Sequence, residues 1–401
     1  MTYHDNWSAK VVDYVKYAID NSKYYHNKIN LSCLNDLKSI PILKKNDVKN
    51  NYSNILINDK NQQEKHILKK HTSGTSGEPL NVYWNNKDYV ISNLFVWKLR
   101  RIWYNIYPID RLVTFHSATN NFSYSSQKYI KNNTVLSLER CVFTDAILNE
   151  YCDEIRKFDP SWILGPPSTI FLILNYMKEH KIILKNLKYV EFNGEYVEKH
   201  FINTLKMDFG IMVSNLYGSE EFNGIAMTCP NGNMHIITDN VYVETDKFQE
   251  NKLLITSLVN KLMPFIRYDI GDYGYVYKGG VCACGYNDIY LDLIRGRSND
   301  MVTIGNSIIS MSLFNQIIDE MNYSKNKVKQ FFVRFKNNKF TLFILTDFSY
   351  IIELQIQKEY FINKLCVKSG LTTQFFELEI FDDPQLFFNS KSKFSYFIIE
   401  E

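Results

Sequence analysis

Residues 71–80 read HTSGTSGEPL, a stretch that contains two glycines and four hydroxyl side chains. The flanking runs EKHILKKHT and PLNVYW do not have the pattern of a helix start, so we expect a loop between two strands. Small residues let backbone N–H groups and hydroxyls surround phosphate oxygens, because no Cβ atoms obstruct the approach. A plain glycine-rich hairpin loop fits equally well, and no Gly-Lys-Ser/Thr follows as in a Walker A loop. The loop alone leaves both interpretations open.

Outward from this loop, three patterns follow one another along the chain. Helical and strand-like segments alternate from about residue 85 to 220, which indicates an α/β sheet with helices on its faces. From about 223 to 295 the segments are strand-like, and residues 299–401 have an alternation of their own. The polar run RGRSND at 295–300 is the predicted boundary between the last two regions.

The part of the chain before the loop has helical patterns. Apolar residues at Val11, Val12, Tyr14, Val15 and Ala18 predict a helix within residues 8–28. The run LNDLKSIPILKKNDV predicts a short helix, a turn at the proline and a second helix start.

Composition places limits on the partners. The chain has 401 residues, 45% of them hydrophobic and 15% aromatic, which supports real cores and two or three domains. Its 46 basic and 43 acidic side chains give a net charge of only +3, so neither nucleic acid nor a membrane surface is the expected partner. Seven cysteines without a signal-like N-terminus favour a reducing cytoplasm, and no apolar run is long enough for a membrane span.

Two further motifs carry side chains suited to nucleotide binding. In NLYGSEEFNG (215–224), Tyr217 could stack on a base and Glu221 could hold Mg²⁺, a hard cation that prefers carboxylates. In PFIRYDIGDYG (264–274), Asp272 follows a glycine bend and could accept hydrogen bonds from both ribose hydroxyls. The alternative for the first motif is a turn at Gly218 with a solvated acidic pair, and for the second an ordinary hairpin turn.

Two motifs near the C-terminus are basic. In IRGRSNDMV (294–302), Arg297 could contact phosphate or ribose, and the preceding glycine permits a hinge. The stretch NSKSKFSYFI (389–398) contains Lys391 and Lys393, a pair that otherwise forms a solvated surface.

The order of these motifs resembles that of the adenylate-forming enzymes of the acyl-CoA synthetase superfamily. The succession is a Ser/Thr/Gly loop, then YGSEE, RYDIGD, GRSND and a C-terminal KSKF. The chain is most similar to the phenylacetate–CoA ligase branch and its capsular-polysaccharide-biosynthesis relatives. Further matches are VDYVKYAIDNSKYYHNKI, SIPILKKNDV, ILGPPST, FNGEYV and MVTIGNSIIS. On this resemblance the first loop is interpreted as a phosphate loop.

The resemblance implies a fold class and a domain organisation. The fold class is α/β, with a large multi-subdomain N-terminal domain over 1–297 that combines α/β sheets with a β-rich subdomain at 223–295. A small, mobile α+β C-terminal domain over 298–401 would carry the catalytic lysine.

The resemblance also implies roles for individual residues. The ATP β- and γ-phosphates would be held by Thr72, Ser73, Gly74, Thr75, Ser76 and Gly77. The segment that contains Gly194 and Glu195 would line the adenine pocket, and Tyr217 would cover the adenine or the acyl substrate. Gly218, Ser219 and Glu220 would also belong to the nucleotide-binding residues. Glu221 would bind Mg²⁺, Asp272 the ribose and Arg297 the ribose–phosphate region. Lys393 matches the catalytic lysine that bridges the carboxylate and the α-phosphate.

Several positions depart from the family pattern. Leu80 stands where many members have lysine, and Glu220 where Ser or Thr precedes the metal-binding glutamate. Asp269 replaces the usual arginine of the RYRTGD pattern. Ser392 replaces a glycine, which leaves Lys391 as an alternative to Lys393.

A separate set of residues has the composition of a zinc site. CPNGNMH (229–235) and CACG (282–285) supply three thiols and one imidazole, namely Cys229, His235, Cys282 and Cys284. This set matches the tetrahedral Cys₃His complement of structural Zn²⁺, and relatives in the branch carry a similar pairing. Inert buried cysteines are the alternative.

The predicted reaction is ATP-dependent adenylation of a carboxylic acid, aryl or arylacetic, followed by transfer of the acyl group to CoA. The cofactors and co-substrates are then ATP, Mg²⁺, structural Zn²⁺ and CoA. One alternative keeps adenylation and transfers to a carrier-protein thiol or to an amine or hydroxyl of a second small molecule. Another is a non-catalytic nucleotide-binding protein, and a homodimer is left open. The candidate acid-pocket residues are Phe115, His116, Phe122, Tyr124, Phe192 and Asn193.

Overall fold

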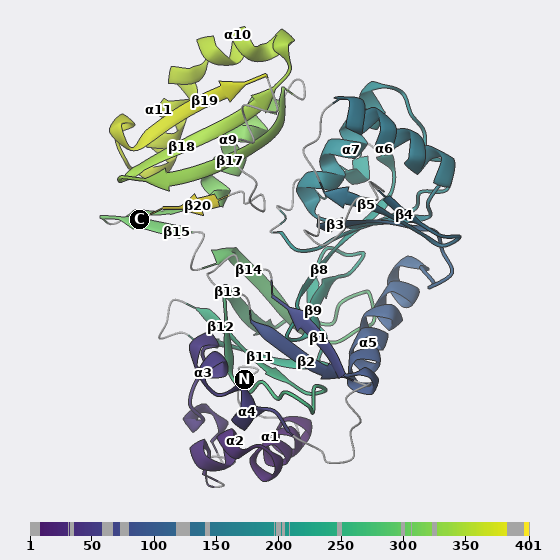
Figure 1. Cartoon of the computed structure of the whole chain (residues 1–401), viewed down its shortest axis with the longest axis vertical. Coiled ribbons are helices and arrows are strands. Elements are labelled where there is room, and N and C mark those ends of the chain that lie inside the picture. Colours follow the sequence, from purple (N-terminus) through teal and green to yellow (C-terminus); the bar gives the residue numbers. More distant parts are fainter. Residues whose placement is uncertain are drawn as a thin grey trace. The chain divides into compact units, whose positions relative to one another are not determined.

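The structure is a computed structural model that describes most of the chain (Figure 1). The described residues are 9–30, 32, 36–57, 67–72, 80–117, 129–140, 145–195, 197, 202, 205–207, 209–246, 251–297, 301–305, 307–322, 327–382 and 397–400. The chain divides into two compact units. The first unit consists of Met1–Leu112, Ser161–Pro167 and Leu187–Ile294, and the second of Val113–Pro160, Ser168–Asn186 and Arg295–Glu401.

Short helices open the first unit. They are α1 (Ala9–Asn21), α2 (Lys23–Lys28), α3 (Lys45–Asn50) and α4 (Tyr52–Ile55), with a 3₁₀ turn at Leu37–Ser39. Helix α1 buries Val11, Tyr14, Val15 and Ala18, which share one face at helical spacing. The predicted helix within residues 8–28 is therefore confirmed, and so is the helix start after the Pro41 turn.

The first loop is flanked by strands, as expected. Strand β1 (Ile67–His71) pairs antiparallel with β2 (Asn81–Asn85), and His71 lies opposite Asn81. Helix α5 (Asn86–Tyr104) follows directly. Its first turn is capped by the Asn85 side chain, which accepts a hydrogen bond from the Asp88 N–H.

Nine of the described strands lie side by side in the main sheet of the first unit, in the order β11-β12-β13-β14-β10-β9-β8-β7-β6. Their bounds are β6 Trp162–Gly165, β7 Tyr189–Phe192, β8 Met212–Ser219, β9 Asn223–Thr228, β10 Met234–Ile236, β11 Val241–Asp246, β12 Lys252–Ser257, β13 Tyr268–Lys278 and β14 Ile289–Arg297. Strands β6, β7 and β8 are parallel, and all four residues of β7 are buried. The β8–β9 and β11–β12 pairs are antiparallel, so the β-rich texture predicted from residue 223 onward is confirmed.

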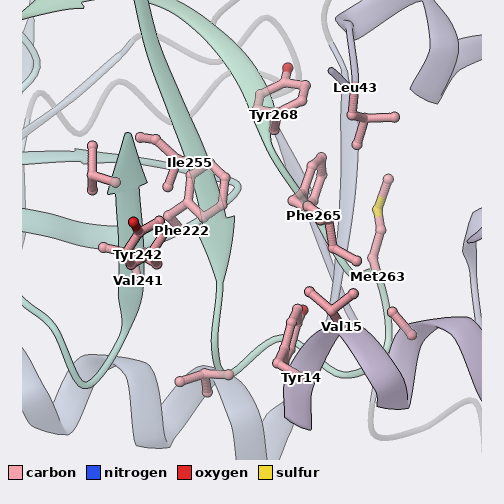
Figure 2. Close-up of a cluster of buried hydrophobic side chains, with 14 of the residues drawn as sticks. Tyr14, Val15, Leu43, Phe222, Val241, Tyr242, Ile255, Met263, Phe265 and Tyr268 are labelled. Carbon is pink, nitrogen blue, oxygen red and sulfur yellow. The ribbon is translucent and has the colours of Figure 1, made fainter. Parts of the chain in front are cut away.

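The core of the first unit joins distant parts of the sequence. Figure 2 shows Val15 of α1 beside Met263 and Phe265 of the segment that leads into β13, all fully buried. Leu43 extends this packing, because its backbone bridges to Tyr268 in parallel. The N-terminal helices are therefore anchored on the β-rich region that carries Asp272.

A buried ion pair fixes α5 to the parallel strands. The Arg100 guanidinium donates two hydrogen bonds to Glu191 of β7, at 2.8 and 2.6 Å, and the Tyr189 hydroxyl donates a third. Trp97 and Trp162 lie against the guanidinium at 4.7 and 5.2 Å. A charge in the core is tolerated here because its polar atoms are satisfied.

The second unit contains two sets of elements. The first set is β3 (Leu112–Ser117), β4 (Tyr129–Lys131), β5 (Val135–Arg140), α6 (Asp145–Phe158) and α7 (Pro167–Glu179). The second begins with the β15–β16 hairpin (Met301–Ile304 and Ser307–Ser310) and α9 (Met311–Asn322). It continues with β17 (Val328–Lys336), β18 (Lys339–Thr346), α10 (Phe348–Ile356), α11 (Lys358–Ser369), β19 (Phe376–Phe381) and β20 (Phe397–Ile399).

These last elements make an α+β body with its own core. Its sheet has the order β19-β18-β17-β20, and α9, α10 and α11 contribute Phe314, Leu354 and Phe361 to a buried cluster on it. The predicted α/β fold with a small α+β C-terminal part is confirmed, while the 297/298 boundary and its mobility stay predictions. Among the described residues, no helix combines the length and the apolar character needed to cross a bilayer.

Candidate functional site

The first loop is closed at its base by two hydrogen bonds between the same pair of residues. The Thr72 N–H donates to the Leu80 carbonyl at 3.0 Å, and the Leu80 N–H donates to the Thr72 hydroxyl at 2.8 Å. Leu80 is fully buried, so the apolar residue at this position has a packing role. Ser73, Gly74, Thr75, Ser76 and Gly77 lie outside the described residues.

The base of this loop is connected to Glu221. The Asn81 N–H donates to the Tyr52 hydroxyl at 2.7 Å, and the Trp84 indole donates to the Glu220 carbonyl at 3.0 Å. Partial burial raises the pKa of Tyr52, and Glu221 is among the charges that raise it further. The residue next to Glu221 is therefore bound directly by the strand that leaves the loop.

A glycine sets the path of the chain from Tyr217 to Glu221. A Cβ on Gly218 would lie 2.1 Å from the carbonyl oxygen of Asn223, a backbone atom of the paired strand. The register of β8 and β9 shifts between Tyr217 and Gly218, and Asn223 has a left-handed φ of 55°. This irregular hairpin turns Glu221 into the interior, where it is 5% exposed. The predicted alternative of a solvated acidic pair therefore fits Glu220, which is exposed, and not Glu221.

Glu221 has a buried tyrosine as its neighbour. The hydroxyl of Tyr268, which is 2% exposed, donates to the Glu221 carboxylate at 3.3 Å. Burial raises the pKa of Tyr268 strongly, and the Glu221 charge raises it further, so the phenol keeps its proton. A carboxylate with a phenol as donor can bind a hard cation through its remaining lone pairs.

Two of the predicted residues form a direct hydrogen bond. The Tyr217 hydroxyl donates to the Asp272 carboxylate at 2.6 Å, although 55 residues separate them. Gly271, with φ of 84°, makes the bend that precedes Asp272, and the Gly271 N–H donates to Asp269 at 3.0 Å. Asp269 also pairs with Lys252 at 3.1 Å, which gives this carboxylate a structural role.

The segment after β7 supplies the predicted adenine-pocket residues. Gly194 has a left-handed φ of 77° and follows Asn193, whose N–H donates to the Gly165 carbonyl at 3.0 Å. Glu195 is half-buried, while Phe192 is fully buried among core residues. In the second unit, His116 has a partner of its own, the Ser137 hydroxyl at 2.8 Å.

The remaining predicted residues fall largely outside the described part of the chain. Phe122, Tyr124, Lys391, Ser392 and Lys393 lie there entirely. The structure describes the backbone of Arg297 as the end of β14 and not its side chain. Strand β19 ends opposite Leu345 and β20 begins opposite Val333, so both ends of the interval with the two lysines belong to one sheet.

The cysteine motifs form two turns of the same kind. In the first, the Gly232 N–H donates to the Cys229 carbonyl at 2.9 Å, and in the second the Gly285 N–H donates to the Cys282 carbonyl at 3.0 Å. Both glycines have left-handed φ values, 84° and 73°. Each turn therefore begins at a cysteine and ends at a glycine, whose left-handed conformation L-residues adopt with difficulty.

The two turns bring four potential ligands together. The ligand atoms of Cys229, His235, Cys282 and Cys284 all lie within 4.8 Å of one another. The Cys229 and Cys282 sulfurs are 3.8 Å apart, and Cys284 Sγ is 3.3 Å from His235 Nε2. Burial opposes ionisation of Cys282, but hydrogen bonds from the Cys284 backbone and from Asn233 outweigh it and lower its pKa, whereas burial raises the pKa of Cys284. Metals bind the thiolate form.

Comparison with known proteins rests on solved structures. No family model matches the sequence, and no curated protein matches it. A structure of 2-hydroxyisobutyryl-CoA ligase in the postadenylation state, in complex with R3-HIB-AMP, matches 98% of this chain and 88% of its own, with a TM-score of 0.72 and 16% identity. The same ligase with 2-HIB-AMP and CoA in the thioesterification state matches the same shares with a TM-score of 0.57 and 18% identity.

A third structure covers less of both chains. The anthranilate CoA ligase AuaEII in complex with anthranoyl-AMP matches 79% of this chain and 63% of its own, with a TM-score of 0.50 and 15% identity. Together these similarities show that the chain has the fold of these AMP-forming acyl-CoA ligases, over nearly its whole length.

Proposed function

We propose that this protein activates a carboxylic acid with ATP, forming an acyl adenylate and pyrophosphate, and then transfers the acyl group to the thiol of CoA. The observation that carries the proposal is the meeting of three motifs in one region of the first unit. The Tyr217 hydroxyl donates to Asp272, Tyr268 of the strand that carries Asp272 donates to Glu221, and Trp84 of the strand that leaves the Ser/Thr/Gly loop donates to the Glu220 carbonyl.

Each motif has a task in the first half-reaction. The difficulty of this step is electrostatic, because a carboxylate anion must approach the α-phosphate of a polyanion. Backbone N–H groups and hydroxyls of residues 72–77 would bind the β- and γ-phosphates, and Asp272 would accept hydrogen bonds from the ribose. Glu221 is the residue that would hold Mg²⁺, which supplies positive charge beside the phosphates when bound.

Two basic residues complete the proposed site. Arg297 is assigned to the ribose–phosphate region and Lys393 to the carboxylate and α-phosphate, where an ammonium group offsets the charge of both anions. In the second half-reaction the thiolate of CoA attacks the acyl carbon and AMP leaves. We propose that residues 298–401 move between the two steps, as a hinge at 295–300 would allow.

We propose more specifically that the carboxylic acid is an aryl or arylacetic acid. Its support is the resemblance to the phenylacetate–CoA ligase branch and a fold shared with a ligase crystallised with anthranoyl-AMP. A short hydroxy acid, such as the one in the 2-hydroxyisobutyryl-CoA ligase complexes, is the competing class in the test.

The test is pyrophosphate exchange into ATP with a panel of aryl, arylacetic and short hydroxy acids. Wild-type protein should exchange with at least one acid, and thioester should form only when CoA is added. Glu221→Gln should lower exchange about 100-fold or more, since it removes a charge at the proposed metal site. The control is Asp239→Asn, a half-buried acid of the same unit that pairs with Lys10 at 2.6 Å and should leave exchange unchanged.

The outcomes separate the proposals. Exchange that is followed by an ester or amide, and by no thioester, would contradict CoA as the acceptor and keep adenylation. Absence of exchange with every acid, in protein that binds ATP, would contradict adenylation itself.

We also propose that Cys229, His235, Cys282 and Cys284 hold a structural Zn²⁺. Tetrahedral zinc with Zn–S bonds of about 2.3 Å places its sulfurs about 3.8 Å apart, which matches the separation of Cys229 and Cys282. Four protein ligands leave no open position, so the ion would join the 229–235 and 282–285 segments and take no part in the reaction.

Metal analysis tests this assignment. Protein purified without chelator should contain about one zinc per chain, and Cys284→Ser should lose most of it. Cys366→Ser changes a partly exposed cysteine outside the cluster and should keep the metal. Equal zinc content in the two variants would refute the assignment.

A further inference from the structure

His235 is held in a fully enclosed position. Its side chain is 0% exposed, and the rings of Trp103, Tyr286 and Tyr290 surround it at 5.6, 5.8 and 4.8 Å between centroids. Nε2 faces the Cys284 sulfur at 3.3 Å, and Nδ1 faces the side-chain oxygen of Asn287 at 3.4 Å. The ring therefore presents one nitrogen to the thiols and the other to a single amide.

The orientation of the Asn287 amide is fixed by the backbone. Its Nδ2 donates to the Ile236 carbonyl at 2.8 Å, and its Oδ1 accepts from the Ile289 N–H at 3.1 Å. An exchange of the amide oxygen and nitrogen would set donor against donor at Ile289 and acceptor against acceptor at Ile236. The atom that faces His235 is consequently an acceptor, whichever tautomer the histidine has.

An acceptor at this place favours one tautomer of a neutral histidine. With the proton on Nδ1, the ring donates to Asn287 and directs the lone pair of Nε2 at the sulfurs. With the proton on Nε2, two lone pairs would face each other at the Asn287 contact. The buried ring has no solvent to relieve that repulsion.

From this geometry we infer that Asn287 is a positioning residue that keeps the proton of His235 on Nδ1 and thereby makes Nε2 the metal-ligand atom. The assignment of the tautomer rests on the described contacts, and its effect on metal binding rests on the proposed zinc site. Outer contacts of this kind orient a ligating histidine, and their loss typically lowers metal affinity about 10- to 100-fold.

Three variants at two positions separate positioning from packing. Asn287→Leu keeps much of the volume and removes the acceptor, whereas Asn287→Asp keeps an acceptor toward His235 and loses the donor to Ile236. Asn93→Leu is the control, since the Asn93 amide donates to the Tyr89 carbonyl of its own helix. Zinc affinity, measured by competition with a chromophoric chelator, should fall about 10- to 100-fold in Asn287→Leu. It should stay within a few-fold of wild type in the other two.

Nitrogen NMR of protein with labelled histidine gives a readout that does not need the metal. The signals of His235, identified by comparison with His235→Gln, should show an Nδ1-protonated ring in metal-free wild type and a mixture of tautomers in Asn287→Leu. An Nε2-protonated ring in metal-free wild type would overturn the inference, as would unchanged zinc affinity in Asn287→Leu. If the leucine variant does not fold, the wild-type spectrum and the aspartate variant decide.

The two proposals fail in different ways. Wild-type protein that binds no zinc but shows the Nδ1-protonated ring would refute the zinc site and keep the tautomer assignment. Bound zinc that is coordinated through Nδ1 would keep the zinc site and refute the tautomer assignment.

Discussion

Tyr217→Phe tests the contact that joins two of the proposed nucleotide-binding motifs. The phenylalanine keeps the ring for stacking and removes only the hydroxyl that donates to Asp272 at 2.6 Å. A hydrogen bond to a charged group contributes about 1.5–3 kcal/mol, which corresponds to about a 10- to 150-fold change in an equilibrium constant. Both residues are half-buried, so water replaces part of the loss and the lower half of this range applies.

The assay is pyrophosphate exchange at varied ATP concentration with an acid that the wild type accepts. The KM for ATP should rise about tenfold, because the ribose meets a less ordered carboxylate, while the KM for the acid changes little. Tyr275→Phe is the matched control, an exposed tyrosine of β13, the strand that carries Asp272, whose hydroxyl accepts from Asn251 at 3.2 Å. An unchanged KM for ATP in Tyr217→Phe, or an equal rise in both variants, would refute the role of this contact.

Three further substitutions address the framework around the site. Gly218→Ala places a Cβ 2.1 Å from the Asn223 carbonyl oxygen, so we expect a loss of about 1–3 kcal/mol in the free energy of unfolding and slower exchange; wild-type stability by thermal melting would contradict this. Arg100→Leu leaves the Glu191 carboxylate buried without its cationic partner and should lower the free energy of unfolding by about 3–5 kcal/mol, measured as the urea midpoint against wild type. Burial raises the pKa of Glu244 above its usual value, so this residue makes the folded state less stable as pH rises from the unfolded pKa through the folded one. The melting temperature of Glu244→Gln minus that of wild type should therefore rise with pH. A difference that does not depend on pH would refute this expectation.

Elements with local signals were predictable from the sequence. Helix α1 has its apolar residues at helical spacing, and the first loop is flanked by runs that form the β1–β2 hairpin. The two cysteine turns are also local, because each places a glycine three residues after a cysteine, where a left-handed conformation closes the bend. Each of these features is determined by residues that lie close together in the sequence.

The contacts that complete the site join residues far apart in the sequence, and no local pattern marks them. Tyr268 lies within the quoted RYDIGD motif, yet its hydrogen bond to Glu221 spans 47 residues and became visible only in the fold. Arg100 and Glu191 would be taken for surface charges from the sequence, because the residues next to them in the chain do not indicate that both are buried. Asn287 likewise has no motif of its own, because its role depends on the backbone at Ile236.

A crystal structure with bound ATP would show whether residues 72–77, Glu221 and Asp272 bind one nucleotide. We expect a single ATP whose ribose hydroxyls lie within hydrogen-bond distance of Asp272, with its β- and γ-phosphates in the 72–77 loop and a metal ion at Glu221. An ATP bound elsewhere, or a loop directed away from Asp272 and Glu221, would contradict it.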